Sequence, residues 1–503
     1  MKKLFIMVMA CLAVTYSQAQ DITDAVRYST EGLTGTARFR AMSGAFGALG
    51  GDLSAITVNP AGSAVFANSY ATVTLNYNQR KSETRYFNGI TANENSDVNF
   101  DQAGAVLVFN STDPENKWSK FSLGFNYSQT NNFDDNFVAR GTSNNSIDQY
   151  FLGYADGIPL DLLETVDDET VSDLYTYLGE NEGFGAQQAF LGYQGFIINP
   201  DSNTLENTTY SSAIGAGSFD QQYYYAATGL NGKFSFNLAS EFNNFLYLGA
   251  NLNAHFLNFD RSTRFLENNN NAGSETNEVI FSNNLSTTGS GFSLQLGSIA
   301  KLSDNFRLGI SYDTPTWFTI TEKTTQRLET YSDQFDETIA VNPNVVNFYP
   351  DYKLKTPGKI TGSLAVLFGT QGLLSFDYSY KDYSNTELRP TGDPEFMFQN
   401  SLISDNLKAA STYRIGGEYR IENFSLRGGY RMEESPYEDE VTIGDLNGYS
   451  LGLGYNFGNL KLDLAYDNAT RTDNPRFYQV GLTNTAGIDR DFSSVILSLS
   501  FGI

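Results

Sequence analysis

Alternation of apolar and polar residues is the feature that most constrains how this chain folds. The clearest run spans residues 245–259, where one face is apolar and the other is mostly amide, glycine or tyrosine. The apolar face carries Leu246, Leu248, Ala250, Leu252, Ala254 and Phe256. A period of two indicates a β-strand with two different faces. About ten such residues suffice to cross a bilayer on a tilted strand.

Fourteen segments show this period, and the connections between them alternate in length. The segments are centred near residues 74, 106, 124, 235, 252, 295, 311, 362, 377, 416, 428, 453, 464 and 497. Short turns join them in pairs, and longer polar loops separate the pairs, the longest covering residues 131–221. This arrangement is typical of outer-membrane barrels. We therefore predict an all-β fold, a 14-stranded antiparallel transmembrane β-barrel with long extracellular loops.

Aromatic residues on the apolar faces give an independent indication of orientation. Those near short turns or the C-terminus are Phe121, Phe306, Phe368, Phe424, Phe457 and Phe501. Those near long loops are Tyr127, Tyr312, Tyr380, Tyr430, Tyr449 and Tyr466. Two such belts match two membrane interfaces. A soluble β-sandwich is the alternative, but sandwiches rarely alternate short and long connections so strictly.

Residues 1–19 are predicted to be a signal peptide, with Lys2 and Lys3 before an apolar stretch and a small-residue cleavage site at Ser17-Gln18-Ala19. A lipoprotein signal ending at Cys11 is the alternative. Removal of residues 1–19 leaves 30 basic and 57 acidic side chains and no cysteine. This composition argues against nucleic acid as a partner and excludes disulfides and thiolate metal sites. We expect no cofactor, no bound metal and no catalytic residue.

Residues 20–69, which precede the first predicted strand, are rich in small residues and lack alternation. They are too few to form an independent core. Filling the lumen of the barrel formed by residues 70–503 is the simplest explanation. We therefore call residues 20–69 the hatch.

Two motifs in the hatch resemble those of a known family. Residues 40–44 read Arg-Ala-Met-Ser-Gly, and residues 59–61 read Asn-Pro-Ala. This order and spacing resembles the N-terminal hatch of the FadL family of outer-membrane channels for long-chain fatty acids and other hydrophobic compounds. The residues that carry the resemblance are Arg40, Ser43, Gly44, Asn59, Pro60 and Ala61.

The resemblance implies passive uptake of hydrophobic small molecules by a protein that contacts outer-membrane lipids. The ligand would move from a groove among the loops to a pocket floored by the hatch, and leave sideways through the third strand. That strand carries Phe121, Gly124 and Phe125, and Gly124 marks either a bend or a packing position. The alternative function is an accessory subunit, with protein partners in an outer-membrane secretion or assembly complex. A barrel enzyme is the least favoured reading.

Charged residues are predicted to face the lumen on two adjacent strands, and they are Arg414, Glu418, Arg420, Arg427 and Arg431. Lumen charges are expected to pair, and Glu31 or Asp52 of the hatch could complete the network. Anchoring of the hatch is the favoured role and ligand passage the alternative. The single histidine, His255, is interpreted as a polar lining residue.

The longest loop contains apolar residues at helical spacing. Leu160, Leu163, Val166, Val171, Leu174 and Leu178 are separated by acidic and polar residues. This spacing predicts a short amphipathic helix, with a break near Asp168. Such a helix would cap the barrel or contribute to an apolar groove.

Overall fold

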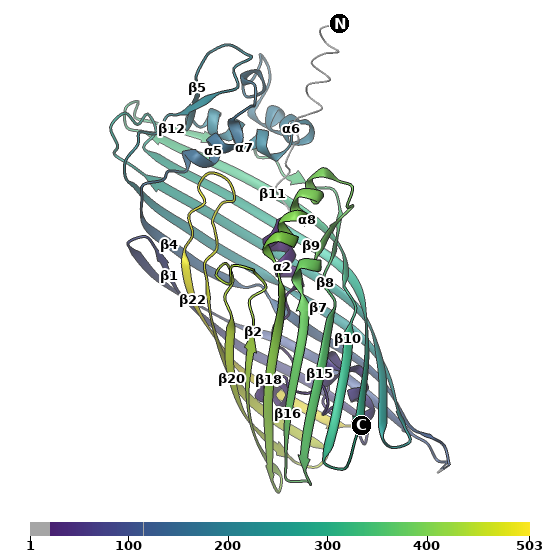
Figure 1. The fold of residues 1–503 in the computed structure, drawn as a ribbon. Helices are drawn as coiled ribbons and strands as arrows, with labels where there is room; N and C mark the ends of the chain where they lie inside the picture. Colours follow the sequence, from purple (N-terminus) through teal and green to yellow (C-terminus); the bar gives the residue numbers. More distant parts are fainter. Residues whose placement is uncertain (1–20, 114) are drawn as a thin grey trace.

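The computed structural model describes residues 21–113 and 115–503, and within them fourteen long antiparallel strands close a barrel (Figure 1). They are β1 (Tyr70–Tyr86), β2 (Gly89–Asn110), β3 (Trp118–Asn132), β7 (Phe219–Phe242), β8 (Leu246–Asn268), β9 (Glu278–Lys301), β10 (Phe306–Asp313), β15 (Lys359–Phe368), β16 (Gly372–Asp382), β18 (Ala409–Ile421), β19 (Phe424–Glu433), β20 (Leu446–Asn456), β21 (Leu460–Asp473) and β22 (Gly487–Gly502). Each predicted segment centre falls in one of them. β22 pairs with β1 and closes the sheet. The predicted fold is confirmed, while the signal peptide prediction lies outside the described residues.

Further helices and strands lie on the long-loop side of the barrel. They are β4 (Asp135–Ser143), α5 (Asp148–Ala155), η2 (Leu160–Leu162), α6 (Val171–Asn181), α7 (Phe184–Gln194), β5 (Ile198–Pro200), β6 (Tyr210–Ser212), β11 (Trp317–Ser332), β12 (Glu337–Val341), β13 (Asn347–Phe348), β14 (Tyr352–Lys355), η3 (Tyr383–Asn385), β17 (Glu387–Arg389) and α8 (Pro394–Asn406). β4 continues the line of β3 along β7, and β11 continues the line of β10 along β9. The wall therefore extends beyond the predicted strands.

Several strands are much longer than the alternation indicates. β9 has 24 residues, and β1 and β2 stay paired up to Tyr86 and Gly89. The outward side chains near the end of β1 are Lys81, Glu83 and Arg85, so apolar alternation ends there although the hydrogen-bond ladder continues. Much of the predicted loop between the first two strands is therefore a hairpin. Charged outward side chains are expected where a barrel wall continues beyond the lipid into water.

The outward face of the barrel is apolar in a band. All six phenylalanines predicted near the short turns are exposed, from 40% for Phe121 to 61% for Phe457. Tyr127 is half-buried and stacks on Phe100 with ring centroids 5.7 Å apart, while the other five predicted tyrosines are exposed. A continuous band of exposed apolar residues is the lipid contact of a membrane barrel. In the described residues, no helix is both long and apolar enough to cross a membrane.

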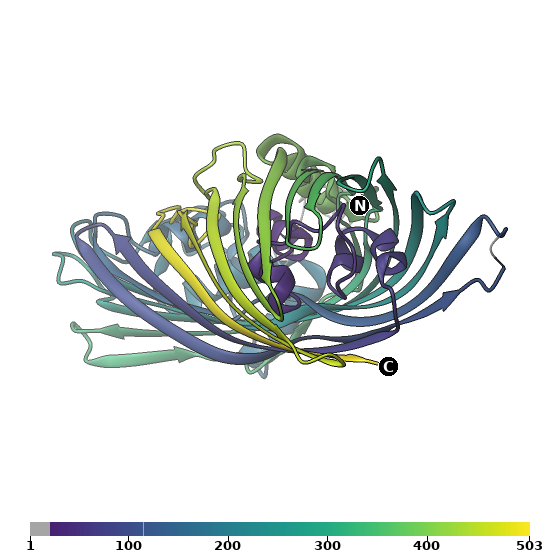
Figure 2. The same cartoon turned by 90° about the horizontal axis from the view of Figure 1, so that it is seen from below.

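The described part of the hatch lies inside the barrel (Figure 2). It consists of α2 (Ile22–Ser29), α3 (Ala37–Ala41), α4 (Ala55–Val58) and η1 (Pro60–Val65). Side chains of Asp21, Thr36 and Asn59 accept hydrogen bonds from backbone N–H groups at the starts of α2, α3 and η1. Such caps satisfy donors that have no partner within a short helix.

The helices of the longest loop form a cap over one end of the barrel (Figure 1). α5, α6 and α7 pack on an apolar cluster that includes Phe151, Leu178 and Phe190. Leu160 and Leu163 belong to a separate turn, and α6 begins only at Val171. Between them the backbone of Asp168 adopts φ +70°, so the apolar spacing covers two helical pieces.

Candidate functional site

The first hatch motif is bound to the wall by buried charges. Arg40 is 4% exposed, and its guanidinium lies 2.9 Å from Asp101 on β2 and 2.7 Å from Asp467 on β21. Ser43 donates its backbone N–H to the hydroxyl of Ser450 on β20 over 3.0 Å. Gly44 follows with φ +79°, a conformation that glycine adopts without strain. The motif therefore fixes α3 to the wall.

The second hatch motif is bound to another part of the wall by amides. The side-chain N–H₂ of Asn59 donates to the carbonyl of Ser298 on β9 over 3.0 Å, and its oxygen accepts from the N–H of Ala61 over 3.1 Å. The carbonyl of Pro60 accepts from Asn237 on β7 over 2.9 Å. A Cβ built on Gly249 of β8 would lie 2.4 Å from the Ala61 nitrogen, so η1 touches the bare wall backbone. All six predicted hatch residues therefore lie in the floor of the lumen.

The structure brings together three of the five residues predicted as a lumen charge network. The carboxylate of Glu418 accepts from Arg427 over 2.6 Å and from Arg420 over 2.5 Å. Arg431 lies 3.5 Å from Glu433 instead. Arg414 stands apart, and its buried Nε has no hydrogen-bond partner among the described residues.

The hatch joins this network through Arg38 rather than through an acid. Arg38 donates to Glu418 over 2.8 Å. Asp52 accepts from the hydroxyl of Thr36 over 2.8 Å, and burial raises its pKa although Arg38 opposes the rise. Glu31 lies elsewhere, 2.6 Å from Lys359. Neither Glu31 nor Asp52 contacts the network directly, because Glu418 and Asp463 supply the carboxylates that its arginines contact, although the charges of Asp52 and Arg38 still attract each other.

The wall ladder between β2 and β3 is interrupted. Pairing runs from Asn110 opposite Lys120 to Gln102 opposite Ser128 and ends there. Beside this point the register of β3 against β7 shifts between Gln129 and Asn131. Gly124 lies within the regular ladder, opposite Val106 and Asn237, which favours the packing interpretation over a bend. The register of β3 against β7 also shifts between Trp118 and Lys120, so the two irregularities of the third strand flank the stretch that holds Phe121, Gly124 and Phe125.

A short hatch segment closes the inner side of this interruption. We call residues 30–35, which join α2 to α3, the linker. The N–H of Gly32 donates to the carbonyl of Thr130 over 2.8 Å, and the hydroxyl of Thr34 donates to the carbonyl of Gln129 over 2.5 Å. The linker thus supplies partners to backbone carbonyls of β3 at the point where β2 leaves the ladder.

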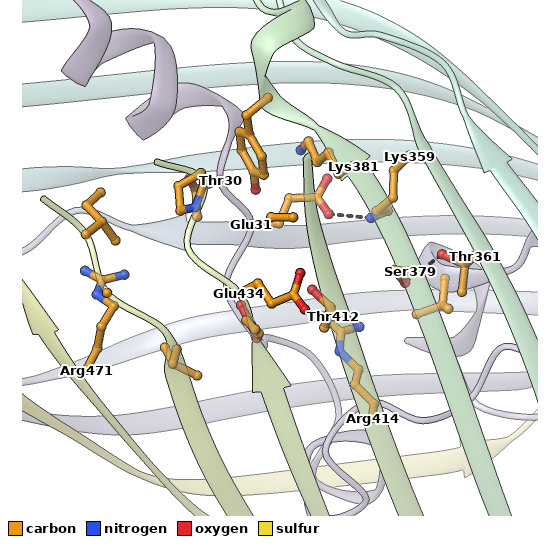
Figure 3. Close-up of a pocket in the computed structure, with 18 residues that line it drawn as sticks. Thr30, Glu31, Lys359, Thr361, Ser379, Lys381, Thr412, Arg414, Glu434 and Arg471 are labelled. Carbon is orange, nitrogen blue, oxygen red and sulfur yellow. Dashed lines mark hydrogen bonds and ion pairs between the residues drawn. The ribbon is translucent and has the colours of Figure 1, made fainter. Parts of the chain in front are cut away.

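Two cavities flank the linker. The inner cavity, about 90 Å³, is lined by residues including Glu31, Lys359, Lys381 and Arg414 (Figure 3). The wall cavity, about 50 Å³, is lined by residues including Glu31, Lys233, Gln102 and Ser128–Thr130. They share Glu31, Val58, Lys359 and Arg414. The linker therefore separates the lumen from the interrupted wall.

Above the linker, α2 packs into a space lined by apolar residues of the wall and loops, which we call the apolar chamber. Val26 and Tyr28 pack on an apolar cluster of the wall and loops that includes Phe259, Phe318 and Phe396. Arg27 pairs with Asp24 and lies 4.3 Å over the ring of Phe259. The side chains of α2 therefore fill the apolar space between these wall and loop residues.

His255 lies on the same stretch of wall, with its Nε2 2.9 Å from the hydroxyl of Ser293 and its ring against Phe318. These are contacts of a lining residue on β8. Within residues 21–113 and 115–503, no group of three histidines, cysteines or carboxylates has the geometry to hold a metal ion.

Sequence reasoning missed Arg38, Asp101 and the lysines around Glu31. An outward-facing aromatic or aliphatic residue stands next to each of the lysines, Lys233, Lys359 and Lys381. Because successive residues of a strand face opposite sides of the sheet, the alternation alone could have placed these lysines on the lumen side. No pattern marks Asp101, which is the extra residue where β1 and β2 change register. Bulges of this kind depend on pairing and leave no sequence period.

Comparison with known proteins gives a family and a fold. The model of the family described as "Outer membrane protein transport protein (OMPP1/FadL/TodX)" matches residues 196–497. A FadL homologue from Pseudomonas aeruginosa is similar at 13% identity, with 94% of this chain and 99% of that chain covered and a TM-score of 0.53. The Pseudomonas putida toluene transporter TodX is similar at 12% identity, with 94% and 100% covered and a TM-score of 0.52. Among curated proteins the search found no match.

Proposed function

The chain belongs to the OMPP1/FadL/TodX family of outer-membrane transport proteins, channels for hydrophobic compounds, and from this premise we propose that it takes up long-chain fatty acids and similar molecules passively. In this proposal residues 1–19 are a signal peptide that directs export, residues 20–69 are the hatch, and residues 70–503 form the barrel in the outer membrane.

The proposed route runs sideways through the wall. A ligand enters among the extracellular loops, reaches the apolar chamber now filled by α2, and passes the linker to the interruption between β2 and β3. The observation that carries the proposal is the pair of cavities on the two sides of the linker, one of which reaches Ser128–Thr130 at the end of the ladder. Both are smaller than the roughly 300–1,000 Å³ of ordinary ligand pockets, so passage requires the linker to move.

A cross-link between linker and wall tests this route. A Cβ built on Gly32 lies 3.7 Å from the side-chain oxygen of Asn131, so a short bis-methanethiosulfonate reagent spans a Gly32→Cys, Asn131→Cys pair. Uptake of radiolabelled oleate by cells that express the cross-linked protein should fall to the level of cells without the gene, and a reductant, which cleaves the reagent from both cysteines, should restore it. Each single cysteine variant serves as a control.

Unchanged uptake in the cross-linked protein would refute the lateral route. Equal uptake with and without the gene, together with stoichiometric protein partners after purification, would instead favour the accessory-subunit function.

A further inference from the structure

The inner and wall cavities bring three lysines from three strands to one hatch carboxylate. Lys359 of β15 lies 2.6 Å from Glu31 and 3.0 Å from Asp313. Lys233 of β7 is only 8% exposed and makes no direct hydrogen bond or ion pair within the described residues. Lys381 of β16 points into the same space (Figure 3). A cation buried without a direct partner is costly, so this position favours an anion.

The other acids that line the inner cavity are held elsewhere. Glu434 accepts the backbone N–H of Ser411 over 2.9 Å, and Glu433 lies 3.5 Å from Arg431. Arg414, with its unpartnered Nε, adds a further positive charge to both cavities. Glu31 is therefore the hatch carboxylate that the lysines share, and the charge of Asp313 on β10 also attracts all three lysines.

Glu31 is held as an anion and yet borders open space. Burial acts to raise its pKa, but Lys359, Lys381 and Lys233 outweigh burial and hold the pKa well below its usual range. Its side chain is 43% exposed, and this surface faces the cavities that it lines. A ligand therefore has access to the position that the carboxylate occupies.

The anion position is mechanically joined to the wall. Glu31 lies between Thr30, whose carbonyl accepts from Asn131 over 3.3 Å, and Gly32, whose N–H donates to Thr130. On the other side, Lys381 donates to the carbonyl of Ser29 at the end of α2. The same few residues thus bind the lysines and cover the end of the β2–β3 ladder.

We propose that Lys233, Lys359 and Lys381 form a binding site for the carboxylate of an amphipathic ligand, and that Glu31 is its built-in occupant. This inference rests on the proposed function and narrows its substrate class to hydrophobic molecules with a terminal anion. A ligand carboxylate takes the place of Glu31, and the linker then loses its hold on the lysines and on β3. Binding of the ligand and opening of the wall are therefore coupled, because the ligand carboxylate replaces the carboxylate of Glu31 on the lysines.

The test compares laurate with dodecan-1-ol, two probes of equal chain length of which only laurate is charged. Binding is measured with the full chain in phosphatidylcholine nanodiscs and corrected for nanodiscs without protein. Laurate should bind the wild type more tightly. Lys233→Met and Lys381→Met should each weaken laurate binding about tenfold and leave dodecanol binding unchanged, as loss of a charge-assisted hydrogen bond implies.

Glu31→Gln removes the competing carboxylate and should tighten laurate binding about tenfold without affecting dodecanol. Lys120→Met is the matched control, since Lys120 has lumen parity on β3 and its partner Glu241 keeps Lys301 at 3.1 Å. It should change neither probe. Native electrophoretic mobility and a thermal melt verify that each variant is folded.

Equal binding of laurate and dodecanol by the wild type, or Glu31→Gln and lysine variants that behave like the control, would overturn this inference and leave the channel intact. A wild-type protein that binds neither probe would instead contradict the proposed function. Laurate binding that depends on the lysines while Glu31→Gln has no effect would refute the exchange of carboxylates.

Discussion

The hatch has two parts that are bound to the barrel in very different ways. Residues 36–66, which we call the floor, are held by buried ion pairs of Arg38 and Arg40 and by amide hydrogen bonds of Asn59. Residues 21–35, which comprise α2 and the linker, are held by apolar packing, a few hydrogen bonds and the exposed carboxylate of Glu31. Both cavities lie beside the second part.

We infer from this difference that the floor holds the hatch in the barrel and that the linker is the part that moves. Breaking a buried ion pair leaves an uncompensated charge and is strongly destabilising, so the floor is expected to stay in place. Single hydrogen bonds contribute roughly 0.5–1.5 kcal/mol each, so the linker can leave the wall at modest cost. Local opening is expected where such contacts are few.

The largest expected effect is the loss of the ion pairs of the floor. Arg40→Met leaves Asp101 and Asp467 buried without their cation and should lower the free energy of unfolding by about 3–5 kcal/mol. Urea-induced unfolding in detergent measures the change. Arg140→Met, at an exposed arginine of β4, is the control and should be neutral. Equal stability of the two variants would show that the floor is no better anchored than the rest of the hatch.

A smaller effect is expected where the floor touches the bare wall. Gly249→Val places side-chain atoms against Pro60 and Ala61 and should cost about 1–3 kcal/mol, as overpacking does. Displacement of η1 should also raise ion conductance in planar bilayers. Gly362→Val is the matched control, because a Cβ at Gly362 meets no atom within 4 Å. If only the control altered conductance, the contact between η1 and β8 would not seal the lumen.

A substitution in the linker should have a small effect on stability and a large effect on uptake, unlike the substitutions in the floor. Thr34→Val removes the hydrogen bond to Gln129 and should cost only about 0.5–1.5 kcal/mol, while it accelerates uptake of a hydrophobic probe. Thr57→Val, which removes a hydrogen bond to Ser54 within the floor, is the comparison. Uptake rates are measured in proteoliposomes. Equal rates for the two variants would contradict the idea that the linker moves while the floor stays in place.

The smallest effect is expected from pH. Because the pKa of Glu31 is lowered in the folded protein, its contribution to stability is present above the unfolded pKa and is lost only as pH falls through the lower folded value. Protease sensitivity of the linker should therefore stay constant between about pH 6.5 and pH 5, a range above the usual pKa of glutamate and well below that of the lysines. Increased cleavage within this range would show that Glu31 is not held by the lysines.

Much of the barrel is predictable from the sequence because lipid and lumen impose opposite demands on successive residues. The runs near 252 and 453 show this directly, and their strands β8 and β20 have the expected parity. The hatch motifs at Arg40 and Asn59 can also be recognised in the sequence. The residues that bind them cannot be predicted in this way, because Asp101, Asp467 and Ser298 come from strands distant in sequence.

The amino-acid sequence by itself determined the number of strands and which of their residues face outward, since both depend on a period of two along each strand. The tertiary structure alone decided where the β2–β3 ladder ends, which carbonyls the linker covers and which lysines meet Glu31. The physical reason is that a bulge and a converging charge cluster arise from register between strands. Register between distant strands is a property of the closed barrel.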